Sequence, residues 1–320
     1  MSAFEPFEDA AEIEDLADRL ADRDPSVRRI AVIELGDTAD PAAVPLLLSA
    51  LRDTVADVRL QAAQALEAFD GPDVAAGLSA AVADTDKAVA DAAAVSLTEL
   101  KDPEAAPAML PYLETDNAFV RASIFRGLKE LRNPVSLRAA LAAIEDPVPA
   151  VRVQAVGVIG YLKADEALPA LIVATRDDAA EVRRAAIGAL AFSRSSHATD
   201  ALMTGLDDAE WQVREISAET MGKTGLTDGI NKLMAAMEDD YWQVRVQAAR
   251  SLGKLKAVRA IPILAPALQH SISNLRKDAA AALGEIAHPD GLPYLEQAAD
   301  DIDPDVRKNV RWAIGRIRAA

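Results

Sequence analysis

The sequence predicts an all-α fold, a solenoid of about ten stacked helix pairs that are 31 residues long. The first observation is a column of ten apolar residues at a constant spacing of 31, with no insertion or deletion between any two. Its members are Val27, Val58, Val89, Val120, Val151, Val182, Val213, Val244, Leu275 and Val306. The second is that 51% of the residues are hydrophobic but only 4% aromatic, which favours thin, closely packed helices. A fixed period of about 20–50 residues indicates a repeat array whose units stack on one another.

Each repeat begins with a helix that we call helix A, followed by a turn that is rich in aspartate. Ile13, Leu16 and Leu20 have helical spacing in the first repeat, and the same columns return in later repeats. The turn residue is Thr115 in one repeat and His270 in another, and it is aspartate in eight repeats. These are Asp22, Asp53, Asp84, Asp146, Asp177, Asp208, Asp239 and Asp301. We expect this aspartate to accept hydrogen bonds from the first turn of the next helix, helix B.

Helix B contains the apolar residue that recurs every 31 residues, which we call the Val column. Its buried face is predicted to consist of this residue and the residues four and eight places after it, the Ala and Leu columns. In the first repeat these are Val27, Ala31 and Leu35, which share one face at 100° per residue. A glycine follows the Leu column in six repeats, and we expect it to loosen or end helix B. These glycines are Gly36, Gly160, Gly222, Gly253, Gly284 and Gly315. Prolines at one shared position then separate repeats, where a missing amide donor does little harm. They are Pro41, Pro72, Pro103, Pro134 and Pro289.

This pattern resembles a HEAT repeat, and specifically the short HEAT-like repeat of phycobilisome lyases. The resemblance rests on the Asp turn, the Val-Arg pair, the Ala column, Leu-Gly and a proline within helix A, and it covers about residues 9–318. It implies a right-handed superhelix of helix pairs, with helix B lining the concave side. We expect residues 9–320 to form a single solenoid and residues 1–8 to be an N-terminal tail or an edge cap. In the second case Phe4 and Phe7 would cover the first repeat.

An arginine follows the Val column in nine repeats, with Ala90 as the exception. A ladder of arginines can bind phosphate, but this column lies beside the buried face. We therefore predict a structural role, in which each arginine bonds the turn aspartate or carbonyls of its own or a neighbouring repeat.

The columns of helix B opposite the buried face vary between repeats, and they hold most of the large aromatic residues. Aromatic residues and arginine are frequent anchors of protein interfaces. The centre of the predicted site is the pair Trp211 and Trp242, in one column of adjacent repeats, with Tyr241 beside them. The predicted partner-binding residues are completed by Gln212, Gln243, Glu215, Arg250, Lys254, Phe119, Arg126, Tyr161, Arg184, Phe192 and Trp312.

Catalysis and metal binding have little support in the sequence. There is no cysteine, and the three histidines, His197, His270 and His288, occupy different columns, so they are predicted to be turn residues. The His-Glu pairs of deoxyhypusine hydroxylase, a di-iron HEAT enzyme, do not occur. We predict no catalytic residue, no cofactor and no metal.

The net charge of −17 is unevenly distributed along the chain. Residues 1–160 hold 14 Lys or Arg against 28 Asp or Glu, whereas residues 241–320 hold 12 against 8. Because phosphate attraction dominates nonspecific binding of nucleic acids, the acidic total disfavours DNA and RNA. No apolar run approaches the roughly 20 residues that span a bilayer, so a membrane role is not expected.

The sequence therefore predicts a non-catalytic scaffold, adaptor or assembly factor that binds a protein partner through its concave helix-B face. It is expected in the cytoplasm, and the acidic first half and basic last repeats would allow a homo-oligomer through the ends of the solenoid. The first alternative is a phycobilin lyase, in which Trp242 and Arg250 would hold a linear tetrapyrrole. The second is a HEAT-type nucleic-acid-binding protein or DNA glycosylase, with Trp211, Trp242 and Asp278 in its groove.

Overall fold

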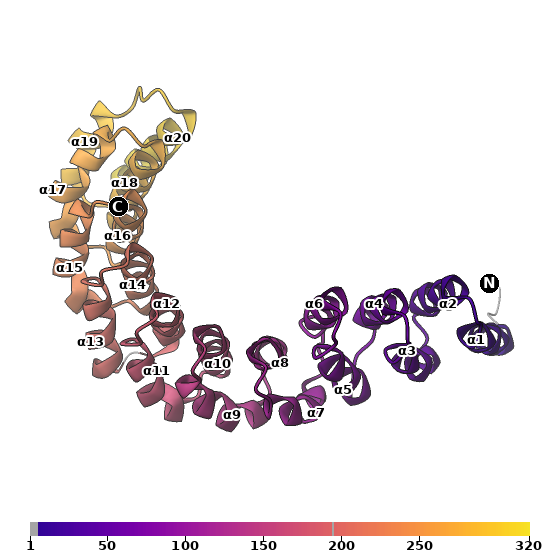
Figure 1. The fold of residues 1–320 in the computed structure, drawn as a ribbon. Coiled ribbons are helices and arrows are strands. Elements are labelled where there is room, and N and C mark those ends of the chain that lie inside the picture. Colours follow the sequence, from indigo (N-terminus) through magenta and orange to yellow (C-terminus); the bar gives the residue numbers. More distant parts are fainter. Residues whose placement is uncertain (1–5, 194) are drawn as a thin grey trace. The chain divides into compact units, whose positions relative to one another are not determined.

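The computed structural model describes residues 6–193 and 195–320, and side chains from residue 13 onward, and all regular elements in this part are helices (Figure 1). Contacts divide the chain into two compact halves, Met1–Leu162 and Lys163–Ala320. We describe each half by itself. Helix α1 begins at Pro6, inside the predicted tail of residues 1–8. The proposed covering role of Phe4 and Phe7 lies outside the described side chains.

The N-terminal half alternates helix A and helix B through five repeats. Its α-helices are α1 (Pro6–Leu20), α2 (Pro25–Asp37), α3 (Val44–Ala50), α4 (Ala56–Ala65), α5 (Pro72–Ala81), α6 (Lys87–Ser96), α7 (Ala106–Met109), α8 (Ala118–Leu131), α9 (Leu137–Ala142) and α10 (Pro149–Leu162). Its short 3₁₀ helices are η1 (Pro41–Ala43), η2 (Leu66–Ala68), η3 (Pro103–Ala105), η4 (Leu110–Leu113), η5 (Pro134–Ser136) and η6 (Ala143–Glu145). The even-numbered α-helices are the helices B of these repeats.

The C-terminal half repeats the same arrangement. Its α-helices are α11 (Leu168–Ala174), α12 (Ala180–Ala189), α13 (Ser196–Gly205), α14 (Trp211–Thr224), α15 (Ile230–Ala235), α16 (Trp242–Lys254), α17 (Ile261–Leu264), α18 (Ser273–Ile286), α19 (Leu292–Gln297) and α20 (Pro304–Arg318). Its 3₁₀ helices are η7 (Asp165–Ala167), η8 (Leu190–Phe192), η9 (Thr227–Gly229), η10 (Ala236–Glu238), η11 (Val258–Ala260), η12 (Pro266–Gln269) and η13 (Pro289–Gly291). Its even-numbered α-helices lie in one row in Figure 1, beside a row of odd-numbered helices.

The prolines between repeats start helices, as predicted. Pro41 begins η1, where the side chain of Asp40 accepts a hydrogen bond from Ala42 N–H at 2.8 Å. The second proline of helix A, such as Pro45, then falls in the first turn of the following α-helix. Proline is tolerated there because its missing N–H has no partner within the helix, so two prolines can begin one helix A.

The predicted buried face of helix B is confirmed. Val244, Ala248 and Leu252 of α16 are each 0% exposed. In the first repeat Ala31 and Leu35 are also 0% exposed, whereas Val27 is half-buried. Small residues at the middle position let helix B lie close to the neighbouring helices, and Leu at the end fills the remaining volume.

The interpretation of the glycine column as a helix end is wrong. Gly253 and Gly284 lie inside α16 and α18, which continue to Lys254 and Ile286. A Cβ added to Gly253 would lie 2.8 Å from Cα of Ala282, and one added to Gly284 would lie 2.8 Å from Cα of Ala313. Gly253 and Gly284 are therefore required by the close approach of successive helices B. The sequence pattern marked the correct column but suggested the wrong cause.

This close approach predicts opposite effects of one substitution at two glycines. Gly253→Ala is expected to be less stable than Gly315→Ala by about 1–3 kcal/mol, because only the first inserts a methyl group into a filled contact. Gly315 has no atom within 4 Å of an added Cβ, so alanine there should stabilise helix α20 by about 0.5–1 kcal/mol. Urea denaturation of both variants measures the difference. Equal stabilities would show that the contact at Gly253 is not tight.

The turn aspartate does not cap the first turn of helix B, contrary to the prediction. A carboxylate oxygen of Asp239 accepts the N–H of Tyr241, at 2.9 Å, and Tyr241 is the residue that precedes α16. Two residues separate the aspartate from the helix, so its carboxylate reaches only the amide of the N-cap residue. Where a side chain does cap helix B, it comes from the N-cap position itself, as with Asp24 and Asp303.

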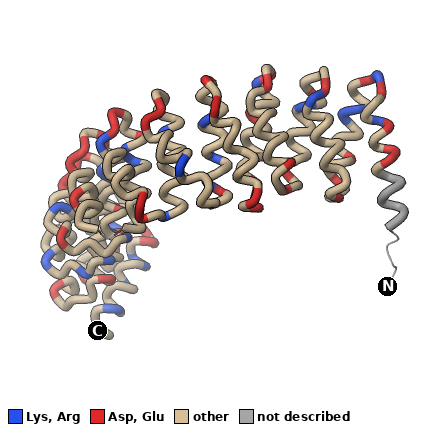
Figure 2. Tube along the Cα trace, turned by 90° about the horizontal axis from the view of Figure 1, so that it is seen from below, with Lys and Arg blue, Asp and Glu red and all other residues tan. Residues whose placement is uncertain are grey.

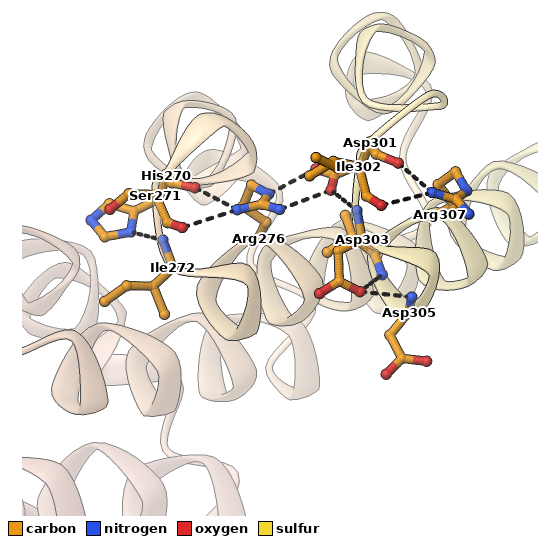
Figure 3. A network of polar contacts seen from close by, with 10 residues as sticks. His270, Ser271, Ile272, Arg276, Asp301, Ile302, Asp303, Asp305 and Arg307 are labelled. Carbon is orange, nitrogen blue, oxygen red and sulfur yellow. Dashed lines mark hydrogen bonds and ion pairs between the residues drawn. The ribbon is translucent and has the colours of Figure 1, made fainter.

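The same carboxylate binds the arginine of the preceding repeat, which confirms the structural role predicted for the arginine column. Nε of each arginine lies 2.6–2.8 Å from one carboxylate oxygen. These pairs are Arg28–Asp53, Arg59–Asp84, Arg121–Asp146, Arg183–Asp208, Arg214–Asp239 and Arg276–Asp301. Figure 3 shows Arg276 between the turns at His270 and Asp301, donating also to the carbonyl of His270 at 2.9 Å. We call this series the Arg–Asp ladder.

Candidate functional site

The centre of the candidate site is an aromatic stack between Trp211 and Tyr241. Trp211 is the first residue of α14, and Tyr241 is the N-cap residue of α16 in the next repeat. Their ring centroids are 5.4 Å apart with 12° between the planes, and the Tyr241 residue is 45% exposed. The guanidinium of Arg214 lies 5.7 Å from the centroid of the Tyr241 ring. Since Arg214 also binds Asp239, the ladder holds this stack in place.

Trp242 was predicted to form the centre of the site together with Trp211. It is the half-buried first residue of α16, and Trp211 stacks on its neighbour Tyr241 instead. Gln212 is exposed, whereas Oε1 of Gln243 is buried without a hydrogen-bond donor among the described residues. Tyr241 therefore has an exposed ring, Trp242 has a half-buried indole, and Gln243 has a buried acceptor without a donor.

A group of charged residues lies along the helices B beside the stack. Glu215 on α14 is half-buried, and its pKa is raised by burial and by the nearby Glu219, although Arg184 and Arg250 oppose the rise. Glu219 also forms an ion pair with Lys223 at 2.8 Å. Glu215 has no hydrogen bond to another described residue, and a partly desolvated carboxylate of this kind is stabilised by a donor from a partner.

Arg250 and Asp278 form a bidentate ion pair between α16 and α18. The Nε and Nη2 atoms of Arg250 donate to the two carboxylate oxygens of Asp278 at 2.9 and 3.0 Å, and Asp278 is 7% exposed. The pair bears on both alternative functions, because each group is already bound. Arg250 is not a free ligand for a tetrapyrrole propionate, and Asp278 is not a free acid in a groove.

The remaining predicted residues of the C-terminal half are spread along its helices B. Arg184 and Lys254 are exposed, and Phe192 is half-buried in η8. Trp312 on α20 is 43% exposed, and the guanidinium of Arg316 lies 5.9 Å from its ring centroid. Among the described residues of this half, no contact joins them to the aromatic stack.

Three predicted residues belong to the N-terminal half and form local contacts there. Phe119 is 42% exposed near the start of α8. Arg126 donates through Nη2 to the carbonyl of Ala94 at 2.9 Å. Tyr161 is 44% exposed, and its ring lies 5.4 Å from Nζ of Lys129. These residues are therefore described apart from the stack of the C-terminal half.

Cavities and metal-binding groups offer no competing centre in the described residues. Two hollows of about 420 and 660 Å³ lie in the N-terminal half, and none of the predicted site residues lines them. Asp84 and Asp146 border them, but each carboxylate is held by a ladder arginine. From residue 13 onward, no group of three His, Cys, Asp or Glu side chains is placed to hold a metal ion. No described helix has the length and hydropathy to cross a bilayer.

Charge is distributed differently in the two halves. Residues 1–162 hold 14 basic and 28 acidic residues, and residues 163–320 hold 20 and 23. Figure 2 shows that many charged residues of the N-terminal half lie near the ends of its helices. The candidate stack therefore lies in the half that is closer to neutral.

Sequence reasoning missed Arg214 and the role of Asp278. Arg214 looked like one more member of a structural column, and its position against Tyr241 depends on the turn geometry between two repeats. The spacing distinguishes the pair Arg250–Asp278 from the ladder, because its two residues are 28 apart in the sequence, whereas those of a ladder pair are 25 apart.

A family model described as HEAT repeats matches almost the entire chain. The matched segments are residues 13–96, 75–149, 137–222, 199–281 and 270–320. No curated protein matches the sequence. The specific resemblance to the repeat of phycobilisome lyases stays a prediction.

Solved structures with a similar fold include an engineered protein, with 18% sequence identity and a TM-score of 0.51 over 96% of this chain and 99% of that chain. YibA of E. coli has 19% identity and a TM-score of 0.54, over 90% and 96% of the two chains. Kap95p, in a structure with RanGDP, has 13% identity and a TM-score of 0.64 over 98% of this chain. This chain spans about half of Kap95p, since the match covers 51% of it. At these identities the likeness concerns the fold.

Proposed function

Because the chain belongs to the HEAT-repeat family, we propose that it is a non-catalytic scaffold or adaptor that binds a protein partner. The binding surface is the helix-B face of the C-terminal half, in the groove predicted for that face, with the Trp211–Tyr241 stack as its anchor. The scaffold would act in the cytoplasm, as the sequence suggests. Arrays of this kind expose an extended surface on a repeated frame, which suits the recognition of a protein.

The observation that carries the proposal is the partial exposure of a rigid aromatic pair. Tyr241 is 45% exposed although its ring stacks on Trp211 and its centroid lies 5.7 Å from the guanidinium of Arg214. A fixed aromatic ring loses little side-chain entropy when a partner covers it, and its hydroxyl supplies a polar contact. Glu215 adds a half-buried carboxylate beside the stack that has no hydrogen bond to another described residue.

Structures of similar fold support this class of function. One structure shows Kap95p bound to RanGDP, and another is a complex of Kap95 with Nup1. A third shows Kap121p bound to the extreme C-terminus of Cdc14p. These partners are those of Kap95p and Kap121p. For this chain we propose only the same type of interaction, in which a helical array binds a protein.

The double variant Trp211→Ala with Tyr241→Ala is expected to weaken partner binding at least about tenfold, as loss of a hot-spot pair should. The measurement is capture from native lysate with the full chain as bait, quantified by mass spectrometry, followed by affinity measurement with the captured protein. Tyr294→Ala is the matched control, because Tyr294 is 39% exposed on α19, a helix A. Unchanged capture by a double variant with normal helicity would exclude this site.

A further inference from the structure

The Arg–Asp ladder has two irregular rungs, and they differ in chemistry. In a regular rung the arginine and the carboxylate are 25 residues apart, as in Arg214–Asp239. At one irregular rung both partners are replaced, since Ala90 stands in the arginine column and Thr115 in the aspartate column. At the other, Arg245 is kept and His270 stands where the carboxylate belongs. The first replacement removes the charge together with its acceptor, whereas the second leaves a guanidinium without its usual acceptor.

No described residue accepts a hydrogen bond from the guanidinium of Arg245, although its backbone N–H donates to the carbonyl of Tyr241 at 3.3 Å. Its Nε is buried without a partner. The equivalent arginines on either side, Arg214 and Arg276, each donate to both oxygens of an aspartate and also to a turn carbonyl. A buried donor that is left unpaired destabilises the fold, and more so when it is charged. A group that completes the rung from outside would recover this energy.

His270 adds a second donor to this rung and no free acceptor. Its Nδ1 accepts the N–H of Ile272 at 3.1 Å, so the neutral ring carries its hydrogen on Nε2. Its backbone carbonyl accepts from Arg276, as Figure 3 shows. Burial, followed by the charges of Arg245 and Arg276, lowers the pKa of His270. Asp301 neutralises Arg276, and Arg245 also lowers the pKa of Asp239, but the two arginines still keep the His270 ring neutral near pH 7.

We propose that Arg245 and His270 form a binding site for an oxyanion, the carboxylate or phosphate group of a ligand, which replaces the missing aspartate of this rung. The guanidinium supplies the charge and a planar set of N–H donors that matches either group. Nε2–H of His270 supplies a neutral donor. The site lies at the turn before α18, and it does not depend on the aromatic stack or on the identity of a protein partner.

The test uses inorganic phosphate and acetate as probes, each compared with chloride at equal ionic strength, on the full chain. In the wild type, the ring signals of His270 in NMR spectra should shift saturably and its pKa should rise, while His197 and His288 serve as internal controls. His270→Asp should restore the Arg–Asp pair and raise the unfolding temperature without any probe. Because this variant lacks the His270 ring, its probe binding and that of the wild type are both measured by calorimetry, and the variant should bind at least about tenfold more weakly. Arg245→Gln should abolish the response of His270.

The two probes separate the sources of the oxyanion. A response to acetate alone supports a carboxylate ligand, a response to phosphate alone supports a phosphate ligand, and a response to both supports a site that accepts either. No saturable response of His270 to either probe would overturn the proposal. Probe binding by His270→Asp equal to that of the wild type would also overturn it, because the new carboxylate should occupy the site.

Discussion

Replacing Leu252 with alanine is expected to lower the free energy of unfolding by about 2–5 kcal/mol. Leu252 is 0% exposed on α16, so its removal loses apolar burial and leaves a cavity that the repeated frame closes only in part. The control is Val258→Ala, since Val258 is 43% exposed in η11 and should change stability by less than about 0.5 kcal/mol. Urea denaturation measures both variants.

The effect of this substitution should also be local. In a repeat array each unit contacts mainly its neighbours, so the lost energy belongs to the repeat of α16 and its two interfaces. Hydrogen exchange is expected to quicken in α14, α16 and α18 before it quickens in the N-terminal half. An even acceleration along the chain would contradict the assignment of Leu252 to a repeat core.

Removing one ladder carboxylate is the second large effect. Asp208→Ala is expected to lower the free energy of unfolding by about 1.5–3 kcal/mol, because Arg183 loses two charge-assisted hydrogen bonds, at 2.7 and 2.8 Å. Asp178→Ala is the control, because Asp178 is exposed in the preceding turn and contributes only its backbone carbonyl to Arg183. Chemical denaturation at pH 7 measures the two variants. Equal stabilities would show that the ladder contributes little.

The contribution of Asp208 should depend on pH in one direction. Burial raises the pKa of this carboxyl, but the hydrogen bonds from Arg183 and from the Glu210 amide outweigh burial and hold the pKa below its usual range. A carboxyl with a lowered folded pKa stabilises the fold above the unfolded value, about 3.9, and loses that effect as pH falls through the folded value. The stability difference between wild type and Asp208→Ala should therefore shrink below about pH 4. A constant difference down to pH 2 would contradict this cause.

The buried frame was predictable from the sequence because it depends on periodicity. Val244, Ala248 and Leu252 follow from a spacing of four residues repeated every 31, and burial at each position agrees. The structural role of the arginine column followed from its place beside this face. Regular columns report contacts that every repeat makes in the same way.

Contacts between repeats were harder to predict because each joins residues at two different positions of the repeat. The glycine at 253 looked like a helix end, since only the position of Ala282 on the next helix shows the close approach. Trp211 and Trp242 were predicted to form the centre of the site because both occupy one column. In the structure the turn places the ring of Tyr241 against Trp211. The unmatched Arg245 required comparison of two columns 25 residues apart, which reading each column alone could not provide.

The central claim is that a protein partner covers the helix-B face around Trp211 and Tyr241. Hydrogen exchange of the chain alone and in complex with its captured partner tests this most directly. If the partner covers this face, hydrogen exchange should be slower in the complex at the first turns of α14 and α16 and along the charged residues of α14 to α18. Slower exchange confined to the helices A, or to residues 1–162, would contradict it.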